Sequence, residues 1–244
     1  MSDLNNRTAV ITGGGSGIGA AIARSLADAG CRVAITGRRQ ERLDDVTENH
    51  NGQVPIIART SDVADRDGVH EFFEWATAEL GPIDILVNSA GINTPVRSVA
   101  ELDPDNWDKL IAVNLTGAYN CIHEVLPGMR ERQDGVIINI SSVAGLRAGT
   151  VGGVAYNASK FGMSALGITV AEEHRELGIR VTNIYPGEVE TPILDNRPVP
   201  VSAEHRARIL QPEDCADAVM MVVRLPARAN IPELVIIPTT QSYK

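Results

Sequence analysis

A tyrosine and a lysine four residues apart are the side chains of this sequence best suited to proton transfer. Tyr156 and Lys160 bound the segment YNASK at residues 156–160, and on a helix residues at i and i+4 share one face. An ammonium group beside a phenol stabilises the phenolate and lowers the phenol pKa from its ordinary value of about 10. We therefore expect Tyr156 to exchange a proton near neutral pH, as a general acid or base does.

A glycine-rich loop supplies the other half of this chemistry. It reads TGGGSGIG over residues 12–19, between a short apolar run and a helical pattern. Gly13, Gly17 and Gly19 lack the Cβ that would keep the backbone away from phosphate oxygens, and the helix N-terminus offers free N–H groups and partial positive charge. The loop is not a Walker A motif, because no Gly-Lys-Ser/Thr follows. The two features together predict a site that moves a hydride and a proton between a dinucleotide and a carbinol.

The second expected strand ends in arginines and carries no acid there. It runs into TGRR at residues 36–39. In dinucleotide-binding folds a carboxylate at this place binds the 2′-hydroxyl of NAD, whereas an arginine accommodates the 2′-phosphate of NADP. A guanidinium suits phosphate because it donates in a planar fork. Arg38 therefore favours NADP(H); NAD(H) is the alternative if Arg38 and Arg39 are solvated residues at a helix start.

The elements that must position these residues alternate between apolar strands and longer helical patterns. Such alternation predicts an α/β fold, a doubly wound parallel sheet of Rossmann type with about seven strands and helices on both faces. Strands are expected at 8–11, 33–35, 54–58, 83–87, 136–140, 179–184 and 234–237, and helices at about 18–29, 40–48, 69–80, 104–132, 155–177 and from 212.

The absence of a linker, charge block or repeat predicts one dinucleotide-binding catalytic domain over residues 1–244. One segment breaks the alternation. Residues 188–211 are proline-rich and have no clean period, and such long irregular segments act as lids or stay disordered. We expect this segment to be the substrate loop.

Composition excludes several classes of protein. The net charge of −9 argues against an extended nucleic-acid surface and against binding to an anionic membrane. The chain has no apolar run near the ~20 residues that a bilayer span requires. The five histidines and three cysteines lack metal-ligand spacing, so no metal site is expected. By elimination, we expect a cytoplasmic protein.

Taken in order, the motifs resemble the short-chain dehydrogenase/reductase family in its single-domain form, over nearly the whole chain. Two departures are Ser89, where a second asparagine is usual, and a gap between Ser142 and Tyr156 that looks one residue longer than is common. The tail at 230–241 looks like that of a subgroup acting on short 3-hydroxy acids. The motifs that carry the resemblance are the loop from Thr12 to Gly19, Asp62-Val63, Asn88-Ser89-Ala90-Gly91, Val113-Asn114-Leu115, Ser142, Tyr156 with Lys160, and Pro186-Gly187.

The resemblance implies catalytic roles for four residues. Tyr156 would be the general acid in reduction and the general base in oxidation, and Lys160 would lower its pKa and bind the nicotinamide ribose. Ser142 would hold the substrate oxygen through the transition state. Asn114 would hold a water molecule that relays protons between Lys160 and solvent.

The resemblance also implies a set of cofactor contacts. Asp62 would accept from the adenine amino group, and residues near 88–91 and 186–191 would line the adenosine and nicotinamide ends. The expected cofactor-binding residues are Gly13, Ser16, Gly17, Ile18, Gly19, Arg38, Asp62, Val63, Asn88, Ala90, Gly91, Tyr156, Lys160, Pro186, Gly187, Val189 and Thr191.

The function expected from all of this is an NADP(H)-preferring oxidoreductase that interconverts a small secondary alcohol or hydroxy acid and its carbonyl. Arg147 and Arg197 could clamp a substrate carboxylate, or be ordinary surface arginines. Leu146, Ile193 and Leu194 would suit a ketone or aldehyde equally well. The alternatives are a nucleotide-sensing regulator without net turnover, and an isomerase or dehydratase that uses the cofactor transiently.

Family members commonly form dimers or tetramers through the two long helices after the fourth and fifth strands. The resemblance therefore implies a homodimer or homotetramer built on the helices at 104–132 and 155–177.

Overall fold

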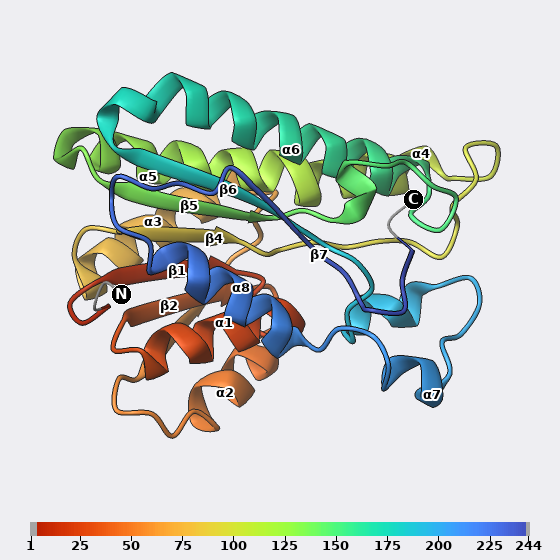
Figure 1. Ribbon diagram of the computed structural model, residues 1–244, viewed down its shortest axis with the longest axis horizontal. Helices are drawn as coiled ribbons and strands as arrows, with labels where there is room; N and C mark the ends of the chain where they lie inside the picture. Colours follow the sequence, from red (N-terminus) through yellow and green to blue (C-terminus); the bar gives the residue numbers. More distant parts are fainter. Residues whose placement is uncertain (1–3, 243–244) are drawn as a thin grey trace.

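The computed structural model describes residues 4–242, and within them seven parallel strands form one sheet in the order β3-β2-β1-β4-β5-β6-β7 (Figure 1). This confirms the predicted doubly wound α/β fold. The order reverses direction between β1 and β4, which is the point where such sheets bind nucleotides. The strands are β1 (Thr8–Thr12), β2 (Arg32–Gly37), β3 (Ile56–Thr60), β4 (Ile85–Asn88), β5 (Gly135–Ile140), β6 (Ile179–Pro186) and β7 (Glu233–Ile236).

Helices cover both faces of the sheet. In Figure 1, α1, α2 and α8 lie on one face, and α3, α5 and α6 on the other. The helices are α1 (Gly17–Asp28), α2 (Gln40–Glu48), α3 (Arg66–Leu80), α4 (Pro104–Ile111), α5 (Gly117–Arg132), α6 (Val154–His174), α7 (Ala203–Arg206) and α8 (Pro212–Val223).

Two hydrophobic layers result from the period-2 geometry of the central strands. Val10 and Leu86 pack toward α3, α5 and α6, whereas their neighbours Ile11 and Val87 pack toward α1, α2 and α8. Every residue of β1, β4, β5 and β6 is buried. Strands buried on both faces read as largely apolar runs, which made β1, β4 and β5 recognisable in the sequence, whereas β6 also buries Arg180, Thr182 and Asn183.

Three element boundaries differ from the expected ones. β3 begins at Ile56 instead of residue 54, because Pro55 has no N–H to donate to the ladder. The helix expected over 104–132 is α4 and α5 joined by a π-helical turn, Ala112–Thr116. Pro104 takes the first helical position of α4 as expected. The helix expected to reach residue 177 ends as α6 at His174, followed by a 3₁₀ turn.

The expected substrate loop is folded around ion pairs. It contains a 3₁₀ turn at Pro192–Asn196, the short helix α7 and a parallel bridge between Val189 and Leu210. Arg206 contacts Glu190 at 2.7 Å and Asp195 at 2.6 Å. In Figure 1 this segment projects from the end of the sheet where the strands finish. It therefore stands over the edge at which a ligand would bind.

Two negative expectations concern membranes and metals. Across residues 4–242, no helix combines the length and apolar character needed to cross a bilayer. The same residues contain no cluster of three or more potential metal-ligating His, Cys, Asp or Glu side chains.

Candidate active site

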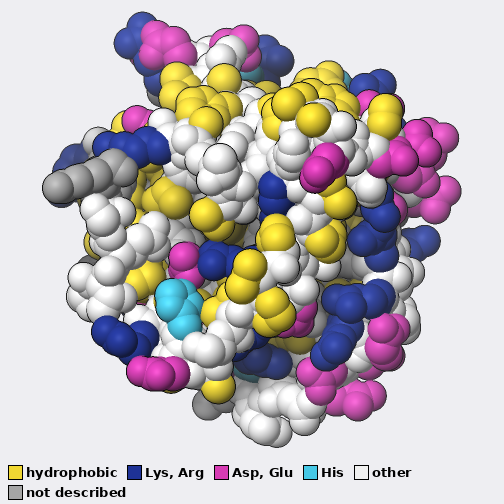
Figure 2. Space-filling view, turned by 90° about the vertical axis from the view of Figure 1, so that its right-hand side faces the viewer, with side chains coloured by type: hydrophobic (Ala, Val, Ile, Leu, Met, Phe, Trp, Pro, Cys, Tyr) yellow, Lys and Arg dark blue, Asp and Glu magenta, His cyan; other side chains and the backbone are white. Residues whose placement is uncertain are grey.

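A cleft of about 820 Å³ runs along the carboxyl ends of the strands. It begins at the glycine loop after β1, passes the loops after β4 and β5, and ends under the 3₁₀ turn at Pro192–Asn196. Figure 2 looks onto this end of the molecule, where basic side chains lie within the hollow and along its rim. The loops after β1 and β4 meet at the point where the strand order reverses, so the cleft occupies the place where open α/β sheets bind ligands.

The glycine loop is packed so tightly that side chains are excluded. Gly13 has φ +66°, and a Cβ there would lie 2.8 Å from the Cα and N of Ala90. A Cβ on Gly19 would collide with the carbonyl oxygen of Gly13. Gly17, with φ +53°, approaches Thr191 so closely that a Cβ would lie 2.9 Å from its Cγ2 atom. The glycine loop therefore presents bare backbone between the loop after β4 and the segment at 188–211.

The N-terminus of α1 opens into this cleft. Ser16 is the N-cap residue, yet its side chain makes no capping hydrogen bond, and the first turn of α1 holds no acidic residue. Ser16, Gly17, Ile18 and Gly19 all line the cleft. The first N–H groups of a helix need an acceptor, and anions are stabilised there by the helix dipole. This end of the cleft fits a pyrophosphate.

Three arginines surround the far end of the cleft. Arg38, Arg39 and Arg42 all line it, because β2 ends at Gly37 and α2 begins at Gln40. One carboxylate, Asp62, faces them, and its Oδ2 lies 3.9 Å from the Arg38 guanidinium. Both side chains are partly exposed, so this ion pair adds little stability. Sequence analysis missed Arg42. Its position in the first turn of a polar helix, three and four residues after Arg39 and Arg38, could have indicated that it faces the same end of the cleft.

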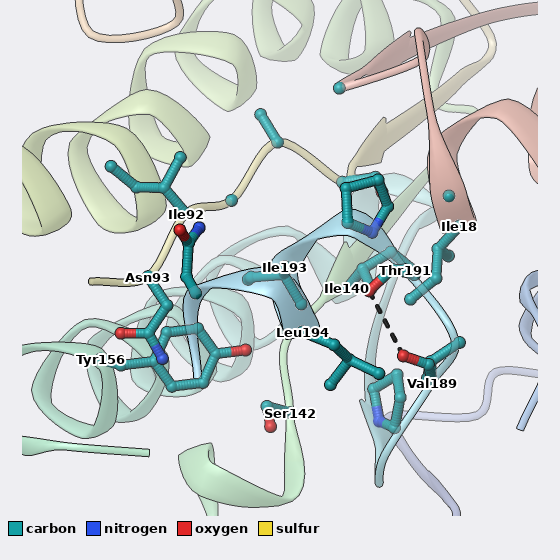
Figure 3. Close-up of a pocket in the computed structure, with 18 of the residues that line it drawn as sticks. Ile18, Ile92, Asn93, Ile140, Ser142, Tyr156, Val189, Thr191, Ile193 and Leu194 are labelled. Atoms are coloured by element: carbon teal, nitrogen blue, oxygen red, sulfur yellow. Dashed lines mark hydrogen bonds between the residues drawn. The ribbon is translucent and has the colours of Figure 1, made fainter. Parts of the chain in front are cut away.

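Tyr156 and Ser142 meet in the middle of the cleft. Ser142 follows β5 and caps the 3₁₀ turn Val143–Gly145, with its Oγ accepting from the Ala144 N–H at 3.1 Å. Tyr156 lies in the first turn of α6, and the Ser142 hydroxyl is near enough to lower the pKa of its phenol. Figure 3 shows both side chains pointing into the same space, beside Ile193 and Leu194. A phenol and a serine hydroxyl that line one cleft side by side could together hold and protonate a carbonyl oxygen.

The phenol pKa differs from the sequence-based expectation. Burial raises the pKa of Tyr156 above its ordinary value of 10, and the nearby Ser142 hydroxyl and the charge of Arg97 offset this rise only in part. Lys160 does not act as expected, because its Nζ lies over the face of the Tyr156 ring, 5.7 Å from the centroid. That ammonium donates to the Ile140 carbonyl at 2.8 Å. The expectation that Lys160 lowers the pKa of Tyr156 in the chain is therefore wrong.

Lys160 itself is strongly affected by its surroundings. Its side chain is only 4% exposed, and this burial lowers the pKa of the ammonium group to about 8. Lys160 still lines the cleft, and its Nζ is one of two atoms that a Cβ on Gly91 would approach at 3.7 Å. An ammonium has three donors; the Ile140 carbonyl accepts from one and the Met163 sulfur from a second at 3.8 Å, so one donor of Lys160 is available for a ligand.

Of the expected cofactor-binding residues, all except Asn88 line this cleft. Asn88 is buried in the sheet, where its amide begins a ladder of side chains. Its Nδ2 donates to Asn139 at 3.0 Å, Asn139 donates to Asn183 at 3.0 Å, and Asn183 donates to the Ser164 carbonyl at 3.0 Å. The ladder links β4, β5, β6 and α6. Asn88 thus fixes the end of β4 to β5 beneath the cleft. A contact between its side chain and a cofactor stays a prediction.

Asn114 lies behind the cleft as well. It is fully buried in the π-helical turn and does not line the cavity. Its Oδ1 accepts from the Ile92 N–H at 2.8 Å, and its Nδ2 donates to the Ile92 carbonyl and to the Ser159 hydroxyl, both at 3.0 Å. The side chain therefore ties the loop after β4 to α6. Its predicted role in holding a water molecule stays a prediction.

The remaining walls of the cleft come from three loops. Ile193 and Leu194 line it as expected, whereas Leu146 does not. Arg147 and Arg197 also line it, and Arg197 forms an ion pair with Glu188 at 3.3 Å.

A further cation, Arg97, lines this part of the cleft, and sequence analysis missed it. Arg97 is the only basic residue in the sequence between β4 and α4. It lies in an aperiodic loop, where pattern analysis offers no guide to side-chain direction.

Comparisons with known proteins agree with this geometry. A family model described as short chain dehydrogenase matches residues 7–199. An uncharacterized oxidoreductase of Staphylococcus saprophyticus is 36% identical over 241 residues, covering 98% of this chain and all of the relative. The closed form of a serine dehydrogenase complexed with NADP⁺ superposes with a TM-score of 0.89 at 33% identity, covering 97% of this chain and 96% of that one. A metagenomic short-chain oxidoreductase in complex with NADP has a TM-score of 0.84 at 34% identity, covering 98% and 100%.

Proposed function

The chain belongs to the short-chain dehydrogenase family and is an oxidoreductase of that family; on this premise we propose that it uses NADP(H) to interconvert a small secondary alcohol or hydroxy acid and the corresponding carbonyl compound. One observation carries the proposal. The Tyr156 and Ser142 side chains lie near each other in the same cleft that the glycine loop lines. The cleft thus combines a proton donor, an oxygen-holding hydroxyl and a phosphate-binding backbone.

The residues at the cofactor end are suited to hold a dinucleotide. The bare backbone of the glycine loop and the open N-terminus of α1 would bind the pyrophosphate. Lys160 would donate to the ribose hydroxyls of the nicotinamide half. When bound, the nicotinamide supplies or accepts the hydride. The protein's own part is to orient the substrate and to move the proton.

Tyr156 carries the proton that it would donate in the direction of reduction. Because burial keeps its pKa above 10, the phenol is protonated at neutral pH. In reduction it would donate this proton to the substrate oxygen as that oxygen gains negative charge, while Ser142 donates a hydrogen bond to the same atom. In oxidation Tyr156 would first lose its proton to solvent, and the phenolate would then accept the proton of the substrate hydroxyl. Arg97, whose charge lowers the pKa of Tyr156, would stabilise the phenolate in that direction.

A screen with both cofactors tests this function. The protein is mixed with NADPH or NADH and a panel of short ketones, aldehydes and keto acids, and the absorbance of the reduced nicotinamide is followed. We expect oxidation of NADPH that depends on a carbonyl compound in the panel. Tight binding of NADPH without turnover of any compound would instead support a nucleotide-sensing protein.

Cofactor choice is expected to depend on Arg38. Arg38→Ala removes a guanidinium from the arginine-rich end of the cleft, and charge-assisted hydrogen bonds contribute about 1.5–3 kcal/mol. We expect the KM for NADPH to rise about 10- to 100-fold and that for NADH to change by less than about 3-fold. Arg228→Ala, at an exposed position outside the cleft, is the matched control. Equal losses with NADPH and NADH would contradict the proposed preference.

We also propose that the protein is a homodimer or homotetramer. Phe161 and Ile168 are seven residues apart on α6, so they share one face, and they are 42% and 51% exposed. Large apolar side chains exposed together mark interaction surfaces. Light scattering on the purified protein is expected to give at least twice the chain mass of 26.1 kDa. A monomer mass at micromolar concentration would contradict the proposal.

A further inference from the structure

The substrate end of the cleft carries more positive than negative charge, although the whole protein has a net charge of −9. Its lining basic side chains are Arg97, Arg147, Lys160 and Arg197, against the carboxylates of Glu188 and Asp195. A local excess of one sign inside a protein of the opposite sign attracts a ligand of complementary charge. The question is which of these cations faces a ligand.

Both carboxylates are already engaged by other groups. Glu188 contacts Arg197 at 3.3 Å and His205 at 2.6 Å, and Asp195 contacts Arg206 at 2.6 Å. Burial works to raise the pKa of Glu188, but the hydrogen bond from His205 and the charge of Arg197 outweigh it and lower that pKa. Glu188 is therefore an anion that balances Arg197. Neither carboxylate is left to balance Arg97.

Arg97 is held rigidly between the two walls of the cleft. Its Nη1 donates to the Gly152 carbonyl at 3.2 Å, on the segment that leads into α6. Its Nη2 donates to the Asn196 carbonyl at 2.9 Å, on the segment at 188–211. Gly153 packs against it, since a Cβ there would lie 2.8 Å from the Arg97 Cδ. A fixed guanidinium loses little conformational entropy when it binds a ligand.

The hydrogen-bonding capacity of Arg97 is far from exhausted. A guanidinium has five N–H donors, and the two bonds described above are to neutral backbone carbonyls. Its Nε is buried and has no partner among the described residues. Burial and the nearby charge of Arg197 both lower the pKa of Arg97. A partly buried cation beside a like charge is costly to hold, and a bound anion would relieve that cost.

We propose that Arg97 binds a carboxylate of the substrate, so that the preferred substrates are short hydroxy acids and keto acids, not neutral alcohols and ketones; this inference rests on the proposed oxidoreductase function. Arg97 lines the same cleft as Tyr156, and the two side chains are close enough for their charges to interact. The carboxylate therefore lies within a few carbon atoms of the reacting carbon. Arg97 fixes the orientation of the substrate and sets its class.

The test compares acids with their uncharged counterparts. The probes are 2- and 3-hydroxy acids of three to five carbons, each paired with its methyl ester, oxidised with NADP⁺. In the natural protein we expect kcat/KM to favour the acids. In Arg97→Gln we expect kcat/KM for the acids to fall about 10- to 100-fold, with less than about 3-fold change for the esters and for NADP⁺ affinity. Arg228→Gln, outside the cleft, should resemble the natural protein.

A non-reactive probe extends the test beyond turnover of the panel. Malonate should inhibit the natural protein competitively against the substrate, whereas the uncharged malonamide should not. Arg97→Gln should lose this inhibition. Because the comparison of malonate with malonamide needs only the natural protein, it decides the question even if the Arg97 variant does not fold.

Two outcomes separate this inference from the function on which it rests. Turnover of esters and neutral alcohols without preference for acids, or equal losses for acid and ester in Arg97→Gln, would overturn the carboxylate assignment and leave the oxidoreductase function intact. Absence of turnover with every compound in both directions would overturn the proposed function itself.

Discussion

Replacing Tyr156 with phenylalanine is expected to lower kcat by about 10²- to 10⁴-fold, the range contributed by a positioned general acid or base. The ring would stay packed beneath Lys160, while the hydroxyl that lies near Ser142 would be lost. The glycine loop and the arginines around Arg38 are untouched, so the Kd for NADPH should change by less than about 3-fold. Steady-state rates and a fluorescence titration with NADPH measure the two quantities.

Tyr119→Phe is the matched control for that variant. Tyr119 lies on α5, is 45% exposed and does not line the cleft. Removing its hydroxyl should leave kcat and the Kd for NADPH unchanged. If Tyr156→Phe retained most of the natural rate, the proton would have to come from another group, and the assignment of Tyr156 would be wrong.

Lys160→Met is expected to reduce activity and to change the pH dependence of stability. Loss of the ammonium removes the donor that we propose for the ribose hydroxyls of the nicotinamide half, and loss of one such charged donor costs about 10²- to 10³-fold in kcat. The stability effect has the opposite sign. A buried ammonium is costly to desolvate, so at pH 7 the methionine variant should unfold at a higher urea concentration than the natural protein.

The sign of the pH effect follows from the lowered pKa of Lys160. In the folded protein this pKa is about 8, against 10.5 as the ordinary value. Below pH 8 the amine is charged in both folded and unfolded chains, so the fold bears the full desolvation cost. Between pH 8 and 10.5 the unfolded chain binds more protons than the folded one. Over this range the free energy of unfolding of the natural protein should therefore rise by on the order of 3 kcal/mol relative to that of Lys160→Met.

Urea unfolding of both proteins at pH 7 and pH 10 measures this difference. Groups that titrate equally in the two proteins cancel in the comparison. Lys109→Met, at an exposed position on α4, should show no comparable change with pH. A difference between the natural protein and Lys160→Met that stays constant from pH 7 to pH 10 would contradict the lowered pKa.

Strong local signals made most of the fold predictable from the sequence. The central strands are buried on both faces, which leaves apolar runs such as the one at residues 136–138. The glycine loop marked the junction of β1 and α1, because only glycine tolerates φ +66° at Gly13 with Ala90 so close. The π-helical turn at Asn114 was not predictable, because it depends on tertiary hydrogen bonds to Ile92 and Ser159.

The site was predictable only where chemistry follows spacing along the chain. The i, i+4 pair of Tyr156 and Lys160 shares a face of α6, but spacing could not show that the Lys160 ammonium turns to the Ile140 carbonyl. Asn88, Asn139 and Asn183 come from strands far apart in sequence, so their ladder appears only once the strand register is known. Arg97 escaped prediction because its partners lie 55 and 99 residues away.

Isotope transfer tests most directly the central claim that Tyr156 protonates a substrate oxygen while a hydride reaches the adjacent carbon. The protein is incubated with NADPH deuterated at C4 of the nicotinamide and with a carbonyl compound turned over in the screen, and the product is examined by mass spectrometry. We expect one deuterium on the carbinol carbon of the alcohol, and in Tyr156→Phe a rate of its formation lower by the same factor as kcat. Binding of NADPH with no labelled alcohol, or undiminished labelling in Tyr156→Phe, would contradict the account.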